Sequence, residues 1–378
     1  MIKTIFTYAP FLMVPVLTLT YGLRTAALLP RHRVRLQAAF TMLMLLAAAK
    51  FLCFREFGGD AFSPVLPEKL IWFWDWAYSG AVILCILEGL SIIVRLKDRG
   101  RKIRALLYPL LAWGISAWGV VNGIVAPEVR ELTLEYADLP AALDGYRIVQ
   151  LTDLHVSSSA RRWRTEEIVR RANALAPDLI CLTGDFVDGT PRHFRRDLEP
   201  IKDLRAKDGV FAVTGNHEYY HPWNEWSWYL LRWNIRVLKD ETVFPHEGLA
   251  LSGVEDRERF ASGYGGAPFN DYENMFGESG AEAGAETRFK ILLKHRPSRA
   301  GRIAAAGCRL QLSGHTHGGI MPLMDRLVAR YNGGFVRGLY ELDGGARLYV
   351  APGSGQWAGF PVRFFNPSEI TLITLKKK

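Results

Sequence analysis

The chain has 378 residues, of which 49% are hydrophobic, and it carries 47 basic and 38 acidic residues for a formal net charge of +9. Residues 1–125 hold 14 of the basic and 6 of the acidic residues, which leaves 33 basic and 32 acidic residues in the rest of the chain. The larger part is therefore almost neutral, and it lacks the basic surface that is typical of proteins that bind nucleic acid.

Four apolar segments occupy the first third of the chain, at about residues 5–23, 36–54, 70–94 and 105–125. A helix needs about 20 mostly apolar residues to cross the hydrocarbon core of a bilayer. The sequence therefore predicts four transmembrane helices within residues 1–125. A cleaved signal peptide is the alternative for the first segment, but three further spans follow it and no clear cleavage site with small residues is present.

Basic residues gather in the first and third loops between these segments. Four arginines lie from Arg24 to Arg35, and six basic residues lie from Arg95 to Arg104. Basic loops remain in the cytoplasm. We therefore expect the N-terminus and everything after Val125 to lie outside the cytoplasm, with the lipid bilayer as a partner.

Three charged residues fall inside the predicted spans, where such residues are candidates for function. Lys50 and Asp75 lie about equally far from the outer ends of their spans. We expect them either to form an ion pair or to extend separately to the membrane interface. Glu88 lies deeper in its span, and the sequence offers it no evident partner.

After a predicted linker over residues 126–145, short apolar strands alternate with polar clusters. Predicted strands over 147–151, 179–182, 210–213, 291–293 and 310–312 are each followed at once by carboxylate, amide or imidazole side chains. Helical patterns separate the first of these strands. The alternation predicts an α/β domain over residues 146–378 with its site at the carboxyl ends of the strands. Later strands, 347–350 and 369–375, are expected to form a second sheet, which gives a sandwich flanked by helices.

The polar clusters together form a mixed oxygen and nitrogen donor set. It consists of Asp153, His155, Asp185, Asn216, His217, His295, His315 and His317. Such donors suit manganese, iron or zinc better than calcium or metals that prefer thiolates. Asp188 is expected to support a ligand or to form a turn. Cys181 and Cys308 lie in or just before buried strands, and they are either core thiols or a disulfide bridge.

The order of the clusters is more specific than any one of them. The set Asp153-x-His155, Gly184-Asp185, Gly215-Asn216-His217-Glu218, His295 and Gly314-His315-Thr316-His317 resembles the signature of the calcineurin-like metallophosphoesterase family. Residues 215–220, 314–319 and 365–370 further resemble its membrane-anchored bacterial branch. The resemblance covers residues 146–378 and implies a four-layer α/β/β/α sandwich, preceded here by the four-helix transmembrane region in a bacterial inner or plasma membrane.

The resemblance also implies two divalent metal ions and a role for each residue of the set. One ion would be held by Asp153, His155, Asp185 and His317, and the other by Asp185, Asn216, His295 and His315. Asp185 would bridge the two ions. His217 would lie near the leaving group as the catalytic acid, without binding metal.

The expected function is metal-dependent hydrolysis of a phosphate monoester, diester or pyrophosphate by attack of a metal-bound hydroxide. The substrate is expected to be a phosphate ester at the outer membrane surface, lipid-linked or derived from the cell envelope. The alternative is a non-catalytic membrane scaffold whose metal site is structural. Lys294 and Ser298 flank His295 where the family usually has small and acidic residues. Substrate preference therefore does not follow from the resemblance.

Overall fold

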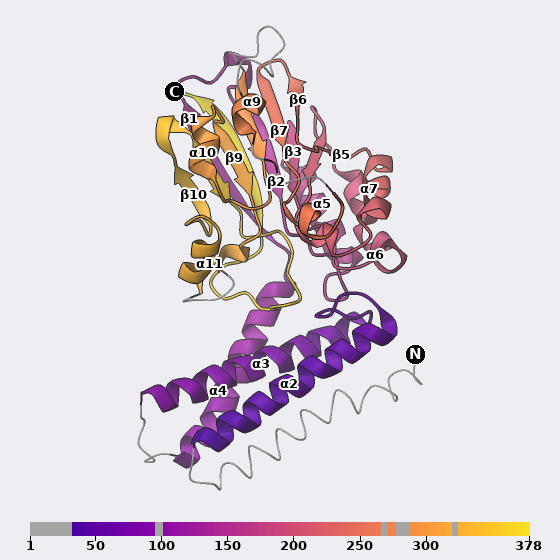
Figure 1. Cartoon of the computed structure of the whole chain (residues 1–378), viewed down its shortest axis with the longest axis vertical. Helices are drawn as coiled ribbons and strands as arrows, with labels where there is room; N and C mark the ends of the chain where they lie inside the picture. Colours follow the sequence, from indigo (N-terminus) through magenta and orange to yellow (C-terminus); the bar gives the residue numbers. More distant parts are fainter. Residues whose placement is uncertain (1–31, 95–100, 266–268, 270, 277–287, 320–323) are drawn as a thin grey trace. The chain divides into compact units, whose positions relative to one another are not determined.

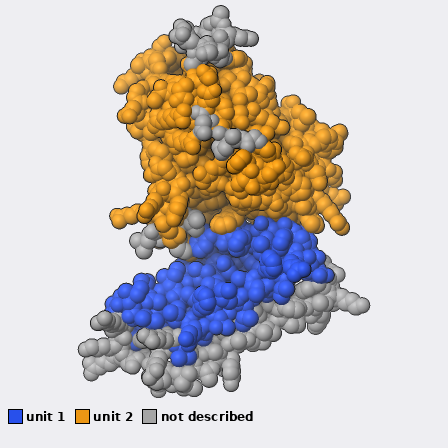
Figure 2. All heavy atoms as spheres, in the orientation of Figure 1, with its two compact units in different colours: residues 1–124, 358–362 blue, residues 125–357, 363–378 orange. Residues whose placement is uncertain are grey.

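The computed structural model describes residues 32–94, 101–265, 269, 271–276, 288–319 and 324–378. The chain divides into two compact units (Figure 2). The first comprises residues 1–124 and 358–362, and the second comprises residues 125–357 and 363–378. Each unit is described by itself below.

The first unit is built from long apolar helices (Figure 1). They are α2 (His32–Phe57), α3 (Glu68–Ile93) and α4 (Arg101–Ile124). Within the part of the chain that the structure describes, three stretches are long and apolar enough to cross a membrane, at Val34–Phe57, Glu68–Ile93 and Ile103–Ile124. They match the second, third and fourth predicted spans. The first predicted span, residues 5–23, lies outside the described residues.

Two buried ion pairs join α2 to α3. Lys50 Nζ lies 2.6 Å from Asp75 Oδ1, so the predicted ion pair is confirmed. Arg35 Nε lies 3.3 Å from Glu88 Oε1, a partner that the sequence did not reveal because it depends on how the two helices pack. All four side chains are at most 2% exposed. Removal of either member of a pair would therefore leave a buried charge without compensation.

The second unit contains two six-stranded sheets. The first has the order β1 (Glu128–Tyr136), β12 (Glu369–Lys377), β2 (Arg147–Leu151), β3 (Leu179–Thr183), β4 (Val210–Val213) and β5 (Arg236–Val237). The second has the order β10 (Gly338–Glu341), β11 (Arg347–Val350), β9 (Leu310–Ser313), β8 (Phe289–Leu293), β7 (Leu249–Gly253) and β6 (Glu241–His246).

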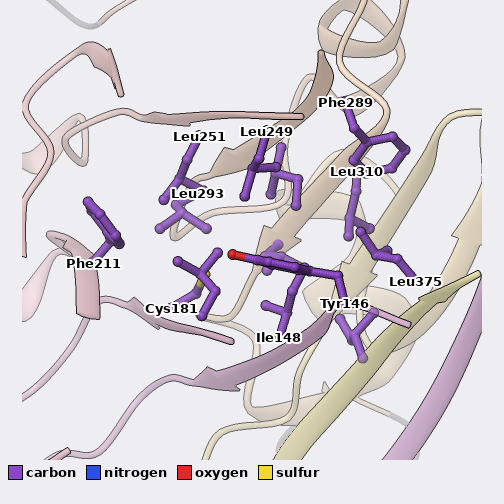
Figure 3. Close-up of a cluster of buried hydrophobic side chains, with 14 of the residues drawn as sticks. Tyr146, Ile148, Cys181, Phe211, Leu249, Leu251, Phe289, Leu293, Leu310 and Leu375 are labelled. Atoms are coloured by element: carbon purple, nitrogen blue, oxygen red, sulfur yellow. The ribbon is translucent and has the colours of Figure 1, made fainter. Parts of the chain in front are cut away.

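The apolar side chains of both sheets form one core between them. Figure 3 shows part of this cluster, with Ile148 and Cys181 of the first sheet close to Leu251 and Leu293 of the second. Cys181 and Cys308 are both buried free thiols, so the alternative of a bridge is wrong.

Helices cover the outer faces of the two sheets (Figure 1). Helices α5 (Arg162–Ala174), α6 (Pro191–Leu198) and α7 (Trp223–Arg232) accompany the first sheet. Helices α9 (Tyr272–Phe276) and α10 (Ala300–Ala305) pack on the second through clusters that include Leu292 of β8 and Leu348 of β11. Short helices α8 (Glu258–Ala261) and α11 (Asp325–Tyr331) complete the unit. The predicted four-layer α/β/β/α sandwich is confirmed.

Two sequence predictions about strands were wrong. Strand β12 was expected in the second sheet, but it pairs antiparallel with β2 and parallel with β1 in the first. Both sheets face the same core, so a fully buried strand has the same apolar pattern in either one. The predicted linker, residues 126–145, instead contains β1. This strand lies at the sheet edge, and most of its residues are exposed, including four charged ones, which is typical of protected edges.

Candidate metal centre

Parallel strands bring the predicted ligands to one edge of the sandwich. In the first sheet β2, β3 and β4 run parallel, and in the second β8 and β9 run parallel. The predicted ligand clusters follow the carboxyl ends of these strands. Parallel strands end at the same edge of a sheet, so side chains that are far apart in sequence can converge there.

Several of these ligands have an uncommon backbone conformation. Positive φ angles occur at Asp153 (51°), His155 (44°), Asp185 (54°), His315 (72°) and His317 (47°). Residues other than glycine rarely adopt this backbone conformation, because their Cβ atom approaches the following carbonyl oxygen. The cost is about 1–2 kcal/mol for each residue. Such strain persists only where the surrounding structure fixes it, and it is concentrated at functional sites.

The first group of facing donor atoms belongs to Asp153, His155 and His317. Nε2 of His155 lies 3.1 Å from Nε2 of His317, which in turn lies 3.5 Å from Asp153 Oδ1. One donor atom from each residue fits within a 4.8 Å span. Asp153 and His155 are fully buried.

The second group belongs to Asp185, His295 and His315. Nε2 of His295 lies 3.1 Å from Asp185 Oδ2 and 3.2 Å from Nδ1 of His315. Nδ1 of His295 lies 2.7 Å from the carbonyl oxygen of Thr183 and donates to it, which directs Nε2 at the other donors. This kind of support fixes both the tautomer and the orientation of a metal-binding histidine.

Asn216 lies between two residues that contact Asp185. Its neighbour Gly215 packs against the Asp185 side chain, and the backbone N–H of His217 donates to Asp185 Oδ1 at 2.9 Å. The Asn216 side-chain oxygen is buried, and none of the described residues donates a hydrogen bond to it. A buried acceptor without a donor carries a desolvation cost, which a cation would remove.

A third group of donor atoms belongs to His155, Asp185 and His217. Asp185 is therefore a member of both the second and the third group. The structure thus brings all seven predicted ligands and His217 together. Facing imidazole nitrogens, buried carboxylates and the Asn216 oxygen together fit divalent cations.

Asp188 contacts two histidines at once. Its Oδ1 lies 3.0 Å from Nδ1 of His155 and 2.7 Å from Nδ1 of His217. Asp188 therefore supports His155, a predicted ligand, as well as His217. Burial lowers the pKa of His217, but the carboxylates of Asp188 and Asp185 outweigh that effect and raise the pKa to about 10. These two carboxylates therefore favour the protonated form of His217.

Glu218 is a structural element of the site to which the sequence gave no role. Its buried carboxylate accepts hydrogen bonds from the backbone N–H groups of Asp185 (2.9 Å), Phe186 (2.7 Å) and Gly215 (2.7 Å). Burial and the nearby Asp185 carboxylate raise its pKa to about 7. Glu218 thereby ties together the two loops that carry Asp185 and Asn216. Its place directly after the ligand motif was the available signal.

Glycine is required at two positions beside the ligands. A Cβ atom at Gly215 would overlap the carboxylate of Asp185. A Cβ atom at Gly314 would overlap the carboxylate of Asp153 and the hydroxyl of Thr152. The backbone can approach the carboxylates this closely only without a side chain. The two glycines therefore explain part of the sequence motif in physical terms.

Comparison with known proteins agrees with this arrangement. A family model for the calcineurin-like phosphoesterases matches residues 146–319, which contain all the predicted ligands. A metallophosphoesterase of Aquifex aeolicus is 32% identical over 250 residues, covering 66% of this chain and 92% of that protein. The chain belongs to the calcineurin-like metallophosphoesterase family. It is thus a metal-dependent phosphoesterase, and members of this family generally bind divalent metals.

The similarity to two further relatives extends beyond the second unit, which carries the candidate metal centre and is called the catalytic unit below. A metallophosphoesterase of Campylobacter jejuni is 29% identical over 351 residues, covering 89% of this chain and 88% of the relative. A transmembrane protein with a metallophosphoesterase domain from Bos taurus is 30% identical over 319 residues, covering 78% and 70% of the two chains. Together with the apolar helices, these relatives indicate that this metallophosphoesterase is associated with a membrane.

Proposed function

We propose that this metallophosphoesterase is a binuclear hydrolase of phosphate monoesters, diesters or pyrophosphates. The observation that supports two ions is the sharing of Asp185 by separate clusters of donors. Asp153, His155, Asp185 and His317 would hold one ion, and Asp185, Asn216, His295 and His315 the other. Manganese, iron or zinc suit these donors. Ions bound there would polarise the phosphoryl group and activate water as the nucleophile.

His217 would act as the general acid that protonates the leaving oxygen. Its Nδ1 is held by Asp188, so Nε2 is the nitrogen from which a proton can be delivered. The Asp188 carboxylate favours a proton on the ring, because it raises the pKa of His217. A positioned acid of this kind contributes roughly 10²- to 10⁴-fold to the rate.

The competing hypotheses are a non-catalytic scaffold with a structural metal and a site in which His217 is itself a ligand. The second has a specific basis, since His155, Asp185 and His217 also form a compact group. Replacement of His217 by alanine separates these possibilities. We expect metal content near wild type and hydrolysis of an alkyl phosphate slowed by about 10² to 10⁴. A nitrophenyl ester should lose much less, because its leaving group departs without a proton. Equal losses on both esters, or loss of metal, would exclude His217 as the acid.

We further propose that the catalytic unit lies outside the cytoplasm and acts on a lipid-linked or envelope-derived phosphate ester. The arginine-rich loops at residues 24–35 and 95–104 support this orientation. Reporter fusions after Val125 should show an extracytoplasmic domain. Higher kcat/KM on a lipid phosphate in micelles than on its soluble headgroup is expected, and equal values would count against a membrane substrate.

A further inference from the structure

Two aromatic side chains from separate segments flank His217. The ring of Tyr220, just after the short helix η3 (His217–Tyr219), lies 5.2 Å from the imidazole of His217 at 65°. The indole of Trp357, in the segment that joins β11 to β12, lies 6.2 Å from the same imidazole at 79°. Trp357 also stacks on His317 at 6.3 Å and 29°. The proposed acid is therefore bordered by two rings.

Exposure differs sharply between His217 and the neighbouring tyrosine. His217 is 9% exposed, whereas Tyr220 is 52% exposed. The half-exposed ring of Tyr220 leaves apolar surface in contact with water. A ligand that covers this surface removes it from water, which favours binding. A group bonded to an oxygen that receives a proton from His217 would come within reach of both rings.

A cationic side chain contacts a different histidine of the site, His315. Arg296 Nη1 lies 3.1 Å from Nε2 of His315, and the same guanidinium contacts Asp256 at 2.9 Å through Nε. The surroundings of His315 thus suit the anionic part of a substrate. The two rings beside His217 suit carbon, since aromatic faces bind flat, apolar surfaces.

We propose that Tyr220 and Trp357 form a leaving-group subsite that selects phosphate esters of alcohols bearing a ring with an apolar face. This inference deepens the proposed function, because it rests on His217 facing the leaving oxygen. Sugars, nucleosides and cyclic alcohols share the required chemistry. Contact with both rings distinguishes such esters from those of small, flexible alcohols.

Binding of phosphonates tests the subsite without requiring turnover. The full-length protein, loaded with manganese in detergent, is titrated with ethylphosphonate and with cyclohexylmethylphosphonate, and both Kd values are measured by calorimetry. We expect the cyclic ligand to bind about tenfold more tightly, the discrimination typical of apolar pockets. In Trp357→Ala the ratio should fall below about twofold, with the Kd for ethylphosphonate little changed. Tyr220→Ala should act in the same direction.

Control variants separate this role from a purely structural one. Trp357→Phe should retain most of the preference, because a ring remains beside His217. Trp228→Ala removes a tryptophan that is 51% exposed on α7 and should leave both Kd values unchanged. The subsite would be overturned if Trp357→Ala weakened the binding of both ligands equally, or if the wild type showed no preference between them. Tighter binding of the linear hexylphosphonate than of cyclohexylmethylphosphonate would also overturn it.

Turnover of the matching phosphate esters distinguishes the two proposals. The alkoxide leaving groups of ethyl and cyclohexylmethyl phosphate have similar basicity, so their kcat/KM ratio reports on contact with the leaving group. A ratio that parallels the binding preference supports the subsite on the reaction path. A binding preference without hydrolysis of any phosphate ester would contradict the proposed function and still support the subsite.

Discussion

The carboxylate of Asp188 lies 2.7 Å from Nδ1 of His217, and this contact both orients the imidazole and stabilises its protonated form. The same carboxylate contacts His155, a predicted metal ligand. Asp188 therefore links the proposed acid to the candidate metal centre. Its removal should affect the acid in a way that pH-dependent rates can detect.

Asp188→Asn should lower the pKa of His217, because the neutral amide no longer favours the imidazolium. The proposed acid must be protonated, so kcat/KM for an alkyl phosphate falls as pH rises through that pKa. In the variant this decline should begin about 1 to 3 pH units lower. Full pH–rate profiles measure the shift, with a nitrophenyl ester and metal content as controls. An unchanged alkaline limb would contradict the assignment of His217 as the acid.

Glu218→Gln should destabilise the catalytic unit by about 1–3 kcal/mol. A glutamine amide group would face a backbone N–H where the native carboxylate accepts hydrogen bonds from three of them. Thermal unfolding and metal content measure the effect. The matched control is Glu166→Gln, whose ion pair with Arg162 is exposed and should contribute less than about 1 kcal/mol. Equal stability of the two variants would show that Glu218 does not tie the loops together.

Gly314→Ala should reduce both metal content and activity. The added Cβ would overlap the carboxylate of Asp153 and force this ligand or the loop to move. Gly301→Ala is the control, since a Cβ there meets nothing within 4 Å and the residue lies in helix α10. That substitution should be neutral or stabilise the helix by up to about 1 kcal/mol. Normal metal content in Gly314→Ala would contradict the packing described for Asp153.

Lys50→Met should destabilise the helical unit by about 3–5 kcal/mol, because it leaves the Asp75 carboxylate buried without its partner. The double substitution Lys50→Met with Asp75→Leu should recover most of the loss. Unfolding of the full-length protein in detergent, followed by circular dichroism, measures both. A double variant no more stable than the single one would show that the ion pair is not the source of the effect.

The sequence was sufficient to predict which side chains come together, because each motif is local. Asp153 and His155, or His315 and His317, directly follow a buried strand, and parallel strands end at a common edge. The convergence of these side chains was therefore predictable before their distances were known. The four-layer sandwich followed from the same alternation together with the family resemblance.

Contacts between distant segments could not be predicted in this way. Strand β12 is buried on both faces, so its apolar pattern fits either sheet. Arg35 and Glu88 meet only because of the particular way in which α2 and α3 pack. Trp357 lies far along the chain from His217, and no spacing rule connects the two. Such pairings depend on tertiary packing, which local sequence patterns do not encode.

Metal content of the purified variants tests the proposed centre, which needs two ions that share Asp185 and no ligand from His217. Elemental analysis of the wild type should give about two divalent ions per chain. Asp185→Asn should lose most of both ions, because one carboxylate serves both sites, whereas His217→Ala should retain both. Retention of one full equivalent by Asp185→Asn, or loss of metal from His217→Ala, would contradict the proposed centre.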